Sequence, residues 1–134
     1  MRIDRESGSI AFHGGSIEPA MSLAAFLASD LGRSSTNSFT HDCWQHFQFD
    51  PEPGIAGTIL FNGGVLDRVF LAMAMPSDKT DEWNELVEHQ RKHTHDSWLR
   101  AELGEPPYRY AWGGVDSEYD SKGCASEIIV TYER

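Results

Sequence analysis

The 134-residue chain has the length of one domain and the composition of an ordinary globular protein that can bury one sizeable core. Its net charge of −10 disfavours nucleic acid and anionic lipid as ligands and favours a basic protein surface, although such a charge also serves solubility alone. The longest apolar run, Met21 to Ala28, is far shorter than the ~20 residues that span a bilayer, and the N-terminus lacks the apolar segment of a secretory signal, so we expect a cytoplasmic protein.

The first half of the chain predicts one helix followed by an antiparallel meander. We expect the helix to begin near Pro19, which suits a first turn, and to end at Gly32, with a loop over residues 33–38. Asn62-Gly63-Gly64 supplies the positive-φ residues of a tight hairpin. The expected strands of this half span residues 9–12, 43–49, 55–61 and 65–75.

The second half repeats this order. A long helix is expected to begin at Ser77 or Thr80 and to end at Gly104. Its inward face includes Trp83 and Trp98, but the middle of that face is polar, so the segment is either one helix or two. Two prolines follow and exclude further helix. The expected strands of this half span residues 108–112, 115–119 and 126–132.

These elements predict an α+β fold, in which an antiparallel meander sheet has helices on one face and its other face open. We expect a single domain over residues 1–134. The repeated order of helix, Leu-Gly, loop and meander suggests a weak tandem duplication, with halves at residues 9–75 and 77–134.

Aromatic side chains share one face of the expected strand after the long helix. Tyr108, Tyr110 and Trp112 stand on alternate residues. We favour a place in the core beneath the helix, because the other face of this strand offers only Arg109 and Ala111. The alternative is an exposed aromatic patch of the kind that dominates protein contacts.

Acidic side chains share one side of the next strand. Asp116, Glu118 and Asp120 form either a solvated, edge-protecting strand or a docking surface for cations. The candidate anchors of a partner are amphipathic side chains on strands that can face outward. The predicted partner-binding residues are Asp116, Glu118, Asp120, Trp44, His46 and Tyr110.

A second group of residues raises the possibility of a metal site. His89, His93 and Asp96 are spaced so that one helix face can present them together, as in a two-histidine, one-carboxylate site. The adjacent Arg91 and Lys92 repel a cation, however. We therefore favour a solvated polar face and expect no metal and no cofactor.

The C-terminal sequence also carries a family resemblance. The pattern LGxPPYxYxWGxVxSxYDxKGxxSxIIVxY, preceded by an HDSWL segment, resembles small bacterial proteins that include immunity proteins of polymorphic toxins. The specific part spans His95 to Tyr132. The repeated helix and meander plan is also similar to the fold shared by the β-lactamase inhibitor protein and the outer-membrane assembly lipoprotein BamE. The resemblance implies an intracellular binding protein with a concave sheet.

Charge and resemblance together predict a non-enzymatic, acidic immunity-type protein. Its partner is expected to be a basic toxin domain encoded by a neighbouring gene, which acidic side chains would attract and block. Two alternatives stay open. One is a small metal-dependent or hydrolytic enzyme that uses His89, His93 and Asp96, and the other is a small-molecule binding module on the open sheet face.

Overall fold

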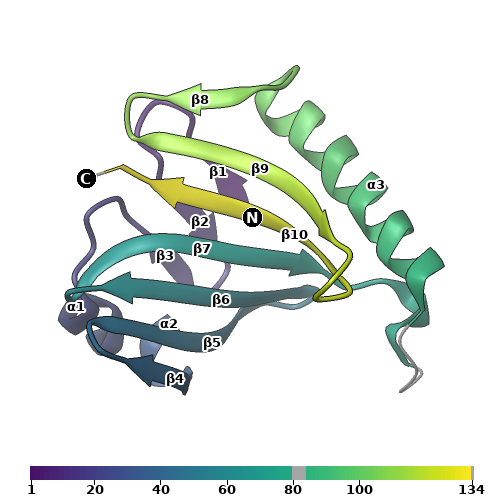
Figure 1. The fold of residues 1–134 in the computed structure, drawn as a ribbon. Coiled ribbons are helices and arrows are strands. Elements are labelled where there is room, and N and C mark those ends of the chain that lie inside the picture. Colours follow the sequence, from purple (N-terminus) through teal and green to yellow (C-terminus); the bar gives the residue numbers. More distant parts are fainter. Residues whose placement is uncertain (80–83, 134) are drawn as a thin grey trace.

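The computed structural model describes residues 1–79 and 84–133, which form two antiparallel sheets and three α-helices (Figure 1). In chain order the elements are β1 Arg2–Ile3, β2 Ile10–Phe12, β3 Gly15–Ile17, α1 Leu23–Ala28, α2 Asp30–Arg33, β4 Thr36–His41, β5 Trp44–Glu52, β6 Ile55–Asn62, β7 Val65–Met73, the 3-10 helix η1 Pro76–Lys79, α3 Glu85–Leu103, β8 Tyr108–Tyr110, β9 Gly113–Asp120 and β10 Ala125–Tyr132. The predicted α+β class is confirmed.

The large sheet joins the two meanders side by side. Its seven strands lie in the order β4-β5-β6-β7-β10-β9-β8, so the last strand of each half pairs at the centre. Leu71 of β7 lies opposite Ile128 of β10. The predicted hairpin between β6 and β7 turns at Gly63 and Gly64, both with positive φ. The arrangement suits two related halves, and the duplication itself stays a prediction.

One face of the large sheet carries the core. Alternate residues of its strands point to this covered face, where α1, α2, the small β1–β3 sheet and α3 pack (Figure 1). Phe26 of α1 is fully buried, and its ring contacts Phe47, Phe49 and Phe61 at centroid distances of 5.9, 5.9 and 5.5 Å. The core side chains contributed by the large sheet are Phe47, Phe49, Ile59, Phe61, Leu66, Val69, Leu71, Tyr108, Val115, Ile128, Val130 and Tyr132.

The first helical segment differs from its prediction at both ends. The helix begins after Ser22 rather than near Pro19, because the Ser22 side chain accepts a hydrogen bond from the backbone N–H of Ala25. Ser29 interrupts it and caps α2. Gly32 therefore lies inside α2 and is not the predicted stop. A Cβ there would lie 1.8 Å from the Phe26 carbonyl oxygen, so the close packing of the two short helices requires glycine.

The second helical segment is one helix, not two. Asn84 caps α3 by accepting from the backbone N–H of Leu86, and Gly104 ends it with a φ of 88°, as predicted. Ser77 lies in η1 instead of capping this helix. The alternative start at Thr80 and the predicted core residue Trp83 lie outside the described residues.

Three strands were not predicted. β4 occupies part of the expected loop, and its six side chains are all exposed, so the sequence shows no alternation there. β1 and β3 have only two and three residues. The strand expected over residues 108–112 ends at Tyr110, so Trp112 lies in the turn after β8.

Candidate functional site

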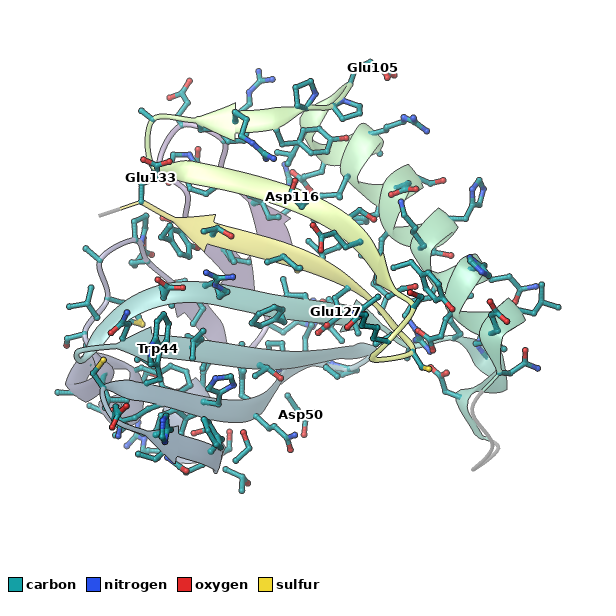
Figure 2. The ribbon with its side chains drawn as sticks, viewed as in Figure 1. Trp44, Asp50, Glu105, Asp116, Glu127 and Glu133 are labelled. Carbon is teal, nitrogen blue, oxygen red and sulfur yellow. The ribbon has the colours of Figure 1, made fainter. Side chains whose placement is uncertain are left out.

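The other face of the large sheet is not covered by any element of the described residues. Its side chains come from alternate positions of β5, β6, β7, β10 and β9, with Arg109 of β8 at one edge. Figure 2 shows Trp44, Asp50, Asp116 and Glu127 spread over this surface, which we call the open face. It is the candidate site because an uncovered sheet face of this size is free to meet a partner.

An aromatic patch occupies the β4–β5 end of the open face. It consists of Phe39, His41, Trp44 and His46. Phe39 is 52% exposed, and its ring meets His46 edge-on at 5.4 Å. His46 lies opposite Leu60, which is 6% exposed and gives the patch an apolar base. Trp44 and His46 are half-buried, so both retain surface for contact.

An acidic patch occupies the β9 side of the same face. Asp116, Glu118 and Asp120 share the open face, as their spacing predicts. Their surroundings differ, however. Asp116 accepts a hydrogen bond from Arg109 at 2.8 Å, while Asp120 accepts from the backbone N–H of Lys122 at 2.9 Å. Glu118 is exposed and faces another carboxylate, Glu127, across the β9–β10 pair.

The predicted anchor Tyr110 lies on the covered face instead. Its ring stacks on Trp112 at 5.2 Å, and both side chains pack against the core. Trp112 in turn contacts Tyr132 and donates to the Arg5 carbonyl at 2.9 Å. The aromatics after α3 therefore belong to the core. Of the six predicted binding residues, the open face brings together Trp44, His46, Asp116, Glu118 and Asp120.

Sequence analysis missed a hollow on the open face. A depression of about 370 Å³ lies between the aromatic and acidic patches, with Ala56 and Ala72 on its floor and Phe70 beside them. Asp50 and Glu127 line it from either side. Asp50, Ala56, Ala72 and Glu127 also line a larger hollow of about 1020 Å³ at the end of the sheet. The sequence signal is that Glu127 is the charged residue of an otherwise uncharged strand.

Glu127 is the unusual carboxylate of this hollow. It is half-buried and has no hydrogen-bond or ion-pair partner within residues 1–79 and 84–133. Burial and facing carboxylates raise its pKa above the ordinary glutamate value. The facing carboxylates are Asp120 and Glu118 of β9 and Glu88 of α3. This side chain therefore carries a charge that nothing in the described chain neutralises.

The nearby Arg91 is already committed to other carboxylates. It is 7% exposed, and its guanidinium donates to both Asp78 oxygens at 2.9 and 2.6 Å and to both Glu88 oxygens at 3.1 Å. These bonds hold the pKa of Arg91 above its usual value despite burial. Arg91 also donates to the Met73 carbonyl. The network ties α3 to η1 and β7, and its positive charge is not free to serve Glu127.

The candidate metal residues do not converge. His89 lies on the Tyr119 ring at 4.4 Å and is 3.6 Å from the Glu85 carboxylate. Asp96 pairs with Lys92 at 2.9 Å, and His93 is exposed. Within the described part of the chain, no three His, Cys, Asp or Glu side chains lie close enough together to hold a metal ion.

No helix among the described residues is long and apolar enough to cross a bilayer.

Comparison with known proteins gives no relative. No family model matches the chain, and no curated protein or solved structure is similar enough to count as a match. The resemblance of the C-terminal pattern to immunity proteins therefore stays a prediction, and function has to be inferred from the open face itself.

Proposed function

We propose that this chain is a non-enzymatic binding protein whose open sheet face captures a basic protein. The observation that carries the proposal is the pairing of an aromatic patch with an acidic patch on one uncovered face. Partly buried aromatic side chains supply most of the holding energy of protein interfaces, and exposed carboxylates supply attraction at range. A net charge of −10 directs that attraction at a cationic partner.

The partner that we propose is a toxin domain encoded by a neighbouring gene, bound and neutralised in the cytoplasm of the cell that makes both. The resemblance of residues 95–132 to immunity proteins supports this choice, and so does the acidic surface. A basic groove that binds nucleic acid would attract the same carboxylates, because they can take the place of phosphates. Blocking that groove would neutralise such a toxin without chemistry.

The test is kinetic binding to the purified toxin domain from the adjacent gene, at low and at high salt. The test variant reverses the charge of two acids that no cation of the described residues pairs with, Glu118→Lys together with Asp120→Lys. It should slow association on the order of tenfold at low salt and little at high salt. Trp44→Ala should instead speed dissociation, with a loss of about 2 kcal/mol, or roughly thirtyfold in Kd.

A matched control separates the local surface from total charge. Glu6 and Glu105 are exposed and lie away from the open face, in the turn after β1 and in the segment after α3. Reversing both changes the net charge equally and should leave the association rate much closer to that of the unaltered protein. Absence of binding to the toxin domain contradicts the proposal, and so does an equal effect of the two reversals.

A further inference from the structure

The hollow on the open face has a layout that selects one kind of side chain. Strand register places Ala56 opposite Ala72, with Asp50 at the β5 end of this row and Glu127 at the β10 end. The next row across the sheet contains Phe70 opposite Ile129. The methyl groups of Ala56 and Ala72 and the ring of Phe70 form an apolar strip in this groove. Polar side chains, Gln48 and Thr58, line the groove beside the strip, and its ends are acidic.

The charge in this groove is unbalanced. The residues that line the two connected hollows include five carboxylates, Asp50, Glu52, Asp78, Glu88 and Glu127. Their cations in the described chain are already engaged. The N-terminal ammonium of Met1 lies 3.0 Å from Glu52 and His13 lies 3.9 Å from it, while Arg91 binds Asp78 and Glu88. Desolvating a carboxylate without a partner is unfavourable, so Glu127 gains most from any cation that reaches it.

We propose that this groove receives one arginine or lysine side chain of the partner, with its stem along Ala56, Ala72 and Phe70 and its cationic head on the Glu127 carboxylate. The inference rests on the proposed function, since it names the chemistry that the open face selects. Long basic side chains suit the groove because their stems are apolar and their heads are not. Arginine suits it best, since its planar head forms two parallel hydrogen bonds with a carboxylate.

Geometry also decides which carboxylate makes the contact. Neighbouring strands lie about 4.8 Å apart, so β5 and β10, three strand spacings apart, are separated by roughly 14 Å. One guanidinium therefore cannot touch both Asp50 and Glu127. Glu127 is half-buried while Asp50 is exposed, and a charge pair gains more where water is partly excluded. Asp50 acts only through its field at the opposite end of the groove.

Binding should therefore depend on pH with a defined sign. Burial, followed by the facing carboxylates of Asp120, Glu118 and Glu88, raises the pKa of Glu127 in the free protein. Arg91, a cation that lines the larger hollow together with Glu127, is already paired. A bound cation favours the ionised form, so binding releases a proton and affinity increases as pH rises through that raised pKa.

The direct probe is N-acetyl-arginine amide, compared with N-acetyl-citrulline amide, a neutral molecule of nearly equal shape. NMR titration of the full chain should give saturable shifts of the Ala56 and Ala72 methyl signals with the arginine probe only. Glu127→Gln should abolish these shifts. Glu6→Gln, the same chemical change on an exposed glutamate away from the open face, should retain them. Equal shifts with citrulline, or shifts that survive in Glu127→Gln, overturn the inference.

The complex supplies a second measurement. Glu127→Gln should weaken binding of the toxin domain ten- to a hundredfold and remove the pH dependence of affinity assigned to this group. The variant should remain folded, because it removes like-charge repulsion. A toxin domain that binds the open face without shifting Ala56 and Ala72 contradicts this inference and leaves the proposed function intact. Binding of the arginine probe in the groove without any binding of the toxin domain supports this inference and contradicts the proposed function.

Discussion

His95 makes the stability of this protein depend on acid. The side chain is fully buried beneath α3, and its Nε2 accepts a hydrogen bond from the backbone N–H of Met73 at 3.0 Å. The ring must therefore be neutral, with its proton on Nδ1, which has no partner among the described residues. Burial, followed by the nearby positive charge of Arg91, lowers the pKa of His95 from 6.5 to about 4.

The direction and size of the effect follow from this shift. Between pH 6.5 and pH 4 the unfolded chain binds a proton at His95 and the folded chain does not, so stability falls as pH falls. Linkage from the two pKa values gives a loss of about 2.5 kcal/mol between pH 7.5 and pH 4.5. That loss is a large part of the roughly 5–15 kcal/mol that stabilises a typical domain.

Urea unfolding across this pH range tests the prediction with His95→Gln. The glutamine oxygen can accept the Met73 N–H, so the variant should lose only about 1 kcal/mol at pH 7.5. It should also lose about 2.5 kcal/mol less than the unaltered protein on acidification, because the carboxylates titrate equally in both. His93→Gln, an exposed histidine on the same helix, is the matched control. Parallel pH curves for the unaltered protein and His95→Gln would refute the reasoning.

Three further changes have expected outcomes that equilibrium unfolding can measure. Arg91→Met should destabilise the fold by about 3 kcal/mol, because it leaves Asp78 and Glu88 without their buried cation, and Arg91→Lys should recover only part of the loss. Phe26→Ala should cost about 3–5 kcal/mol through the cavity it opens, whereas the exposed Phe39→Ala should stay within about 0.5 kcal/mol; similar losses would contradict the assigned burial. Glu118→Lys should leave stability unchanged or raise it by about 0.2–1 kcal/mol, since it replaces a like-charge pair with Glu127, and a clear loss would contradict that pairing.

Alternation in the strands made most of the large sheet predictable. Wherever one face is buried, residues two apart share an environment, and β5, β7 and β10 show this pattern plainly. The sequence did not predict β4, because both faces of this strand are exposed and no residue there needs to be apolar. Burial creates the pattern, and an uncovered edge strand has none.

The polar middle of α3 misled the prediction for a related reason. Arg91 and His95 occupy the covered side of the helix because the backbone of Met73 needs them. Met73 lies two residues beyond Leu71, the last residue of β7 that pairs with β10. Its amide and carbonyl groups therefore bond to side chains of α3 where β10 would otherwise pair, while β6 still lies on its other side. A prediction that requires an unbroken apolar face divides this segment into two helices. In the structure, polar side chains on that face bond to Met73, and the helix is continuous.

The same limit applies to the candidate site. Spacing showed that Asp116, Glu118 and Asp120 share a face, but not that two of them are already hydrogen-bonded, nor that Glu127 stands half-buried beside them. The burial of each carboxylate and its hydrogen-bond partners distinguish two roles in binding that the spacing of charges alone cannot distinguish. Exposed Glu118 acts at range and sets how fast a cationic partner arrives, whereas Glu127 acts only at contact and sets how long it stays. An acidic face with both kinds of carboxylate can attract many basic proteins and retain the one whose basic side chain fits the groove.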